Sequence, residues 1–187
     1  TIANNTLANE EILELRDFIK NGNYSYGDAE TISKDVADEY IDYILERESL
    51  DKKLKIVVDA GNGIAGEIAP KLFERLGCDV TEMYCDIDGT FPNHHPDPSK
   101  LENLKDLIEK VKELKADVGL AFDGDGDRLG IVTNSGATVA ADRQLMLYAK
   151  DVIATKPGAS ILYDVKSTKN IDKFVADLGG KSLMYKT

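Results

Sequence analysis

Cysteine and long apolar runs are both scarce in this sequence, and each shortage excludes a class of protein. Only two cysteines, Cys78 and Cys85, occur among the 187 residues, and both lie on one predicted strand. We therefore expect buried, unpaired thiols in a reducing compartment and no disulfide framework. The longest apolar runs have the length of a strand, far short of the roughly 20 residues that cross a bilayer. The opening TIANNTLANEE lacks a secretory signal pattern, so we predict a cytoplasmic protein without a membrane partner.

Positive charge is also in short supply. The chain has 23 lysines and arginines against 34 aspartates and glutamates, which gives a formal net charge of −11. Nucleic-acid binding depends largely on lysine and arginine contacts with phosphates, so this balance argues against a nucleic-acid partner. A small anionic ligand remains compatible with it wherever a few basic groups converge.

What the sequence does contain is a regular alternation of strand and helix patterns. Two amphipathic helices are predicted first, and from residue 54 onward short β-branched runs alternate with helical periodicity. This order is typical of an α/β fold with a mainly parallel sheet flanked by helices. The predicted helices cover residues 10–20, 33–48, 67–77, 100–115, 142–154 and 170–179, and the predicted strands 54–59, 78–85, 117–122, 129–133, 160–165 and 181–185.

Three local features bear on the ends of the predicted helices. Ser99 and Glu102 match a capping box. Asp142 suits the N-cap of the helix that follows it. Pro70 predicts either a kink or a late start for its helix.

The stretch AFDGDGDRLG places Asp123, Asp125 and Asp127 on one tight loop between two predicted strands. The intervening glycines allow the carboxylates to converge, and converging carboxylates repel each other unless a cation lies between them. Hard oxygen ligands suit Mg²⁺ or Ca²⁺. An EF-hand is excluded, because Arg128 takes the glycine position and Asn134 the final glutamate position, and strands flank the loop. The alternative is a charged, solvated turn without a ligand.

Arg128 adds a cation directly beside these carboxylates. A cation weakens metal binding at such a place unless it serves an anion, and the planar guanidinium suits phosphate. The loop therefore predicts a divalent metal with a phosphate next to it, a common setting for phosphoryl transfer.

A second glycine-rich segment offers a rival interpretation. Gly61, Gly63 and Gly66 form a literal G-x-G-x-x-G between a predicted strand and a predicted helix, and Asp86 follows 20 residues later. This arrangement formally meets the dinucleotide-binding fingerprint of an oxidoreductase domain. Asp59 counts against it, because a carboxylate at the strand end would approach the pyrophosphate. The other interpretation is a tight structural turn whose glycines allow close packing.

Taken together, these segments resemble the α-D-phosphohexomutase superfamily, and most of all its bacterial phosphomannomutase/phosphoglucomutase branch. VVDAGNGIAG, GTFPNHHPDP, GLAFDGDGDRLGIVTN and YDVKST are similar to that branch in order and spacing, over nearly the whole chain. The resemblance implies that Asp123, Asp125 and Asp127 are the magnesium ligands. It further implies that Arg128 acts in the catalytic site near the phosphate, that Lys166 contacts the substrate, and that the glycine segment is a structural turn.

The resemblance also implies an activity. Enzymes of this family interconvert sugar 1-phosphates and 6-phosphates with Mg²⁺ as cofactor. A phosphoserine donates its phosphoryl group, and a sugar 1,6-bisphosphate is the intermediate. The phosphosugar substrate and the other domains of the same enzyme are then the expected partners.

Some of the family's parts are absent. No serine of this chain is followed by histidine, as the family's phosphoserine is, and the sugar-recognition loop is also absent. The resemblance predicts the tail of a first domain over residues 1–30, a metal-binding second domain over 31–138 and the start of a third over 139–187. We expect such a fragment to be inactive by itself.

His94 and His95 are the only histidines, in a proline-rich loop. We predict a mainly structural role for them, since the resemblance implies no metal role for this loop. A non-catalytic domain, in which the aspartates merely brace a loop, is the third functional class that the sequence allows.

Overall fold

The structure is a computed structural model that describes residues 6–22, 24–28 and 30–186. The chain divides into two compact units, Thr1–Asp35 and Val36–Thr187. The predicted boundaries at residues 30 and 138 stay predictions. None of the helices in the described residues has both the length and the apolar character needed to cross a bilayer.

The first unit carries a single described helix, α1 (Glu10–Lys20). Asn21 is the C-cap of this helix, and Gly22 takes a left-handed φ of 65°, as is common after a helix C-terminus. The predicted helix is therefore confirmed. No residue of α1 is buried within the described structure.

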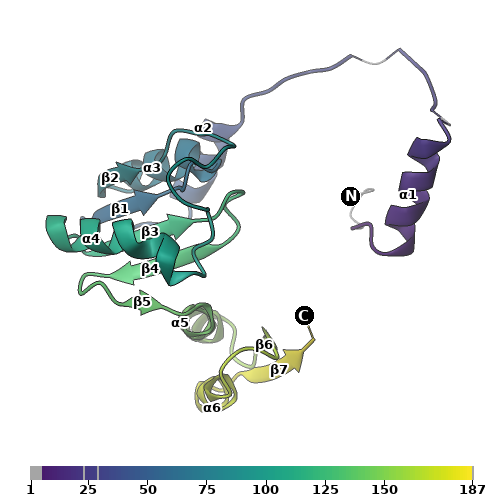
Figure 1. Cartoon of the computed structure of the whole chain (residues 1–187). Coiled ribbons are helices and arrows are strands. Elements are labelled where there is room, and N and C mark those ends of the chain that lie inside the picture. Colours follow the sequence, from purple (N-terminus) through teal and green to yellow (C-terminus); the bar gives the residue numbers. More distant parts are fainter. Residues whose placement is uncertain (1–5, 23, 29, 187) are drawn as a thin grey trace. The chain divides into compact units, whose positions relative to one another are not determined.

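The second unit begins with α2 (Ala37–Leu45) and contains a five-stranded sheet in the order β2-β1-β3-β4-β5 (Figure 1). Strand β1 pairs in parallel with both β2 and β3. The α/β prediction is confirmed, but the sheet is mixed: β4 pairs antiparallel with both β3 and β5, because the loops on either side of β4 are too short for a crossover. The strands are β1 (Lys55–Asp59), β2 (Asp79–Met83), β3 (Val118–Phe122), β4 (Leu129–Thr133) and β5 (Thr138–Val139).

Alternate residues of β1 pack against different helices. Val57 joins a buried cluster with Leu107 and Val111 of α4 (Lys105–Leu114). Its neighbours Ile56 and Val58 pack in a cluster with Ala69 of α3 (Ala65–Arg75). This period of two is what a strand buried on both faces requires.

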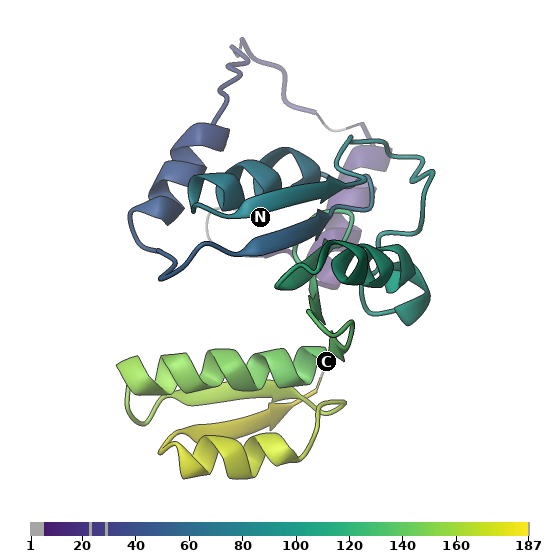
Figure 2. The same ribbon diagram turned by 90° about the vertical axis from the view of Figure 1, so that its left-hand side faces the viewer.

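A smaller two-stranded sheet pairs β6 (Ser160–Asp164) in parallel with β7 (Lys181–Tyr185) (Figure 2). It is accompanied by α5 (Ala141–Thr155) and α6 (Asn170–Asp177). Both helices bury side chains against Ile161 and Tyr163 of β6, whereas Leu162, which points to the opposite face, is 61% exposed. The predicted strand–helix–strand unit is confirmed.

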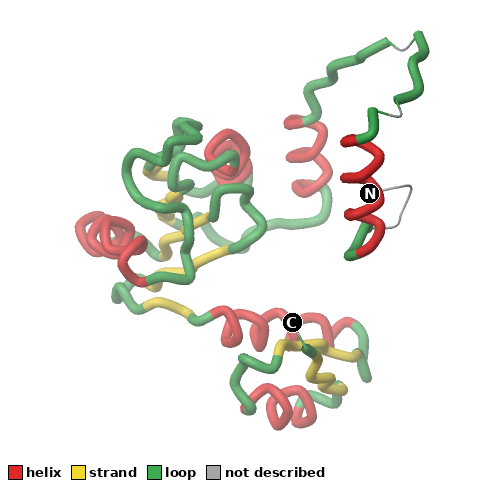
Figure 3. The backbone as a smooth tube through the Cα atoms, turned by 45° about the vertical axis from the view of Figure 1, so that its right-hand side comes forward, coloured by secondary structure: helices red, strands yellow, loops and turns green. Residues whose placement is uncertain are grey.

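Figure 3 shows the helices in red, the strands in yellow and the loops in green. The predicted helix ends are partly wrong. The Ser99 hydroxyl bonds to the Asp97 carboxylate instead of capping a helix, and a short 3₁₀ turn, η1 (Leu101–Leu104), precedes α4. Asp142 lies inside α5, whose N-cap position is Ala140, and its carboxylate accepts a bond from the Thr168 backbone N–H. Pro70 lies buried inside α3.

Candidate functional site

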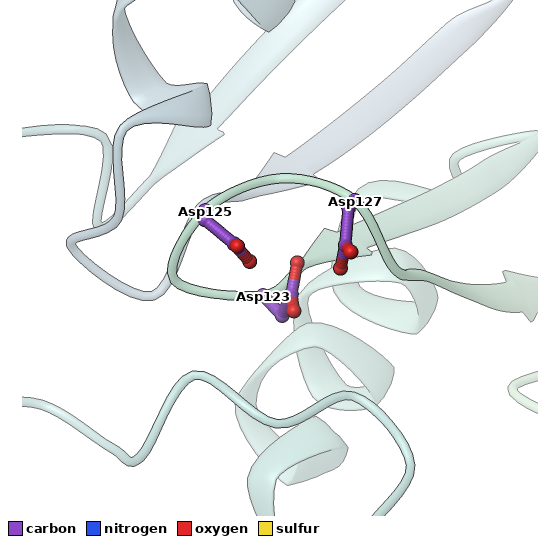
Figure 4. Close-up of side chains that lie close together, drawn as sticks. All are labelled: Asp123, Asp125 and Asp127. Carbon is purple, nitrogen blue, oxygen red and sulfur yellow. The ribbon is translucent and has the colours of Figure 1, made fainter. Parts of the chain in front are cut away.

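The aspartate loop, residues 123–128, joins β3 to β4. Figure 4 shows the side chains of Asp123, Asp125 and Asp127 pointing toward one another across this loop. One carboxylate oxygen from each lies within 4.8 Å of the others. Asp123 is buried, and the other two aspartates are exposed. The predicted convergence of the three carboxylates is therefore present.

Backbone geometry closes the loop. The Gly126 N–H bonds to the Asp123 carbonyl at 3.1 Å, and the Asp123 N–H bonds to the Arg128 carbonyl at 3.3 Å. Gly126 has a φ of +76°, a backbone conformation that residues other than glycine rarely adopt. The alternation of glycine and aspartate thus produces a turn that directs three carboxylates to one place.

Arg128 holds the buried member of the cluster. Its backbone N–H donates to Asp123 Oδ1 at 3.0 Å, and its Nε donates to Asp123 Oδ2 at 2.6 Å. A longer contact of 3.4 Å joins its Nη1 to Asp97 Oδ1. The Arg128 side chain is nevertheless 59% exposed, so the outer part of the guanidinium is accessible to an anion.

The charges of the loop are unevenly balanced. The carboxylates of Asp125 and Asp123 repel that of Asp127 and raise the pKa of Asp127. Burial opposes ionisation of Asp123, but the backbone N–H and guanidinium of Arg128 outweigh it and lower the pKa of Asp123. The bond to Asp123 raises the pKa of Arg128. The repulsion that remains around Asp127 is what a bound cation would relieve.

The donor set fits Mg²⁺. All three side chains offer hard carboxylate oxygens, with no sulfur or imidazole in the cluster. Three protein ligands leave coordination positions for water or phosphate oxygens, as is usual for magnesium.

Asp97 is a site residue that the sequence did not reveal. Its carboxylate receives the Ser99 hydroxyl at 2.6 Å in addition to the contact with Arg128. The Ser99 hydroxyl lowers the pKa of Asp97. Asp97 is therefore an anion that faces Arg128 from 31 positions earlier in the chain, and only the fold brings the two together.

A pocket of about 690 Å³ begins at this site. Asp127 and Arg128 line it together with apolar residues of β4 and α5, among them Ile131 and Leu145. The aspartate loop therefore borders a space large enough for a small molecule.

The second glycine-rich segment is packed as a turn. The backbone N–H groups of Gly61, Asn62, Gly63 and Ile64 all have partners in the protein: Asp59 Oδ1 and the carbonyls of Tyr84, Ala60 and Gly124. A Cβ on Gly66 would lie 2.1 Å from the Cys85 carbonyl oxygen. These N–H groups already have acceptors and are not available to bind a pyrophosphate, and the arrangement favours the structural-turn interpretation.

Lys166 lies in the loop after β6. Its ammonium contacts Asp164 at 3.7 Å, and its side chain is 75% exposed. Within the described residues no hydrogen bond or ion pair joins Lys166 to the aspartate loop. The predicted role of Lys166 therefore stays a prediction.

The fold and this site define an α/β/α domain with an acidic loop at the carboxyl end of a central strand. The model of one family, "Phosphoglucomutase/phosphomannomutase, alpha/beta/alpha domain II", matches residues 38–136. The chain belongs to this family, which confirms the predicted membership of the phosphohexomutases.

Curated relatives and a solved structure agree with this assignment. The chain is 52% identical over 186 residues to the phosphomannomutase/phosphoglucomutase of Pseudomonas putida, of which it covers 40%. It is 47% identical over 188 residues to the phosphoglucomutase of Neisseria meningitidis, of which it covers 41%. A crystal structure of a phosphoglucomutase/phosphomannomutase family protein from Burkholderia thailandensis matches 97% of the chain with a TM-score of 0.93 and 49% identity. The chain thus spans about 40% of the length of these relatives.

Proposed function

We propose that this chain is the central, metal-binding portion of a phosphohexomutase that interconverts sugar 1-phosphates and 6-phosphates. The observation that carries the proposal is the convergence of three carboxylates beside a half-exposed arginine. The names of the relatives support mannose and glucose phosphates as substrates. The route through a phosphoserine and a sugar 1,6-bisphosphate follows from the family resemblance.

In this proposal Asp123, Asp125 and Asp127 hold Mg²⁺, which supplies positive charge where a phosphoryl group is transferred. Arg128 binds a phosphate oxygen through the exposed part of its guanidinium. Its Nε stays on Asp123, which fixes the orientation of the planar group. Lys166 contacts the sugar phosphate from the loop after β6.

The proposed nucleophile is outside this chain, because none of its serines is followed by histidine. The remaining domains of the same enzyme are the proposed partners, and they supply that serine and the groups that recognise the sugar. We place the enzyme in the cytoplasm and expect neither a nucleic-acid nor a membrane partner. By itself the chain is expected to bind metal without catalysing the reaction.

A chimeric enzyme tests the proposal. This chain would replace the matching segment of the Pseudomonas putida relative, and conversion of mannose and glucose 1-phosphates into 6-phosphates would be measured. We expect conversion, and a loss of about 100-fold in the same chimera with Asp125→Asn. Asp177→Asn, which removes the same charge from an exposed aspartate of α6, should leave the rate unchanged. A folded chimera without activity, or full activity with Asp125→Asn, would contradict the proposal.

A further inference from the structure

Asp59 and His94 form a buried pair that the proposed function does not use. Asp59 is the last residue of β1 and is fully buried. His94 Nε2 lies 3.2 and 3.1 Å from the two Asp59 carboxylate oxygens, and the His94 side chain is only 15% exposed. Asp59 is not one of the three clustered carboxylates. A buried ionisable pair outside the metal cluster needs its own explanation.

Both ring nitrogens of His94 are engaged. Nδ1 lies 3.0 Å from the His95 carbonyl oxygen, which can only accept, so Nδ1 carries a proton. Nε2 then shares a proton with the Asp59 carboxyl group. The imidazole is thus held at both ends, and its orientation is set by the chain around it.

Asp59 also fixes the glycine turn that supports the aspartate loop. Its Oδ1 accepts the Gly61 N–H at 2.9 Å. Three residues further, the Ile64 N–H donates to the Gly124 carbonyl at 3.1 Å. A Cβ on Gly63 would lie 2.8 Å from that carbonyl oxygen. The turn therefore touches Gly124, which lies between two of the proposed metal ligands.

His94 belongs to the segment that supports Gly124 from another direction. A Cβ on Gly124 would lie 3.5 Å from Pro96 Cγ and 3.6 Å from Phe91 Cζ. A Cβ on Gly61 would lie 3.1 Å from both His94 Cε1 and Pro96 Cβ. The segment 91–96 and the glycine turn thus meet at Gly61, and each also contacts Gly124.

We infer that Asp59 and His94 are positioning residues for the metal ligands. Their hydrogen bonds join the two segments that enclose Gly124 and thereby hold the carboxylates of Asp123 and Asp125 in convergence. This inference rests on the proposed magnesium site. It assigns the pair a role through hydrogen-bond geometry, because neither side chain belongs to the metal cluster.

The test compares a disrupting and a preserving substitution by amide NMR during a Mg²⁺ titration. Asp59→Ala removes both bonds, and we expect magnesium affinity to fall about 10-fold. Asp59→Asn can still accept from Gly61 and donate to His94, so it should retain the wild-type affinity. His94→Ala should weaken magnesium binding as Asp59→Ala does. If Asp59→Ala does not fold, His94→Ala is the variant that tests the inference. Val111→Ala, a buried change in the cluster around α4, is the control for general destabilisation.

Hydrogen exchange of the Ile64 amide, measured without metal, is the second readout. Exchange should accelerate in Asp59→Ala and His94→Ala but not in Asp59→Asn. Wild-type affinity in both alanine variants would overturn the inference, as would an equal loss in Asp59→Asn or in Val111→Ala. If magnesium does not shift the amide signals of the wild-type chain, the proposed function is contradicted instead. Exchange of the Ile64 amide would then still decide whether Asp59 and His94 position the loop.

Discussion

Two glycine-rich loops follow neighbouring strands of one sheet, and glycine has a different role in each loop. After β1, the turn 60–66 directs its N–H groups into the protein, and its glycines permit close packing against Cys85 and Gly124. After β3, the aspartate loop uses Gly126 for a left-handed residue and sends three carboxylates to one point. The first loop satisfies its polar groups internally, whereas the second keeps mutually repelling charges together.

The difference shows that a glycine motif alone does not identify a site. The G-x-G-x-x-G spacing matches a cofactor fingerprint, but its donors already have partners in the chain. The aspartate loop, in contrast, concentrates charge that the protein only partly neutralises through Arg128. Uncompensated charge, rather than glycine spacing, distinguishes the proposed site from its scaffold.

The largest expected effect comes from placing a methyl group in the glycine turn after β1. A Cβ on Gly66 would lie 2.1 Å from the Cys85 carbonyl oxygen, a backbone atom that can move away only if the chain shifts. We expect Gly66→Ala to lower the free energy of unfolding by about 3 kcal/mol or more. Urea unfolding followed by circular dichroism measures this loss.

Gly124→Ala is the matched variant in the aspartate loop. Its Cβ would meet Pro96 Cγ at 3.5 Å, which is ordinary van der Waals contact. We expect its free energy of unfolding to stay within about 0.5 kcal/mol of the wild type. If Gly66→Ala and Gly124→Ala lowered the free energy of unfolding equally, the proposed difference between the two loops would be contradicted.

A smaller effect concerns Tyr84, whose carbonyl accepts the Asn62 N–H of the glycine turn. Its hydroxyl donates to Asp106 at 2.7 Å, and this bond is the main reason that the pKa of Tyr84 rises from 10.0 to about 12. A raised pKa means that the stabilisation is present below pH 10.0 and is lost as the pH rises through about 12. At neutral pH we expect Tyr84→Phe to cost about 1 kcal/mol.

The pH dependence makes this prediction specific. The difference in unfolding free energy between the wild type and Tyr84→Phe should shrink as the pH rises from 10.0 towards about 12. Tyr26→Phe, at a tyrosine that is 91% exposed, serves as the control and should change little at any pH. A difference that stays constant with pH would show that the hydroxyl bond is not its source.

Much of the fold follows from local pattern, but its polar contacts do not. The strand and helix periods predict the elements, and D-G-D-G-D-R predicts the convergence at the aspartate loop. The two capping predictions fail for different reasons: Ser99 bonds to Asp97, a local partner two positions earlier, whereas Asp142 accepts from Thr168 across 26 positions. The bond of Asp142 depends on which segments meet in space, and neighbouring residues do not encode that contact.

The pairing of Asp59 with His94 illustrates the same limit within the site. Both residues stand out in the sequence, one as an acid at a strand end and the other in a proline-rich loop. Their contact spans 35 positions and requires the sheet to place the end of β1 beside segment 91–96. The sequence therefore identifies the candidate ligands but not the groups that position them.

The most direct test of the proposed metal site is an amide NMR titration of the chain, first with Mg²⁺ and then with NAD, with Asp125→Asn as the matched control. We expect magnesium to shift the Gly124 and Gly126 signals of the wild type, and Asp125→Asn to lose most of that response. We expect NAD to leave Gly61 and Gly63 unmoved. If NAD moved Gly61 and Gly63 while magnesium left the aspartate loop unchanged, the glycine turn would be the binding site, and the assignment of magnesium to the aspartate loop would be wrong.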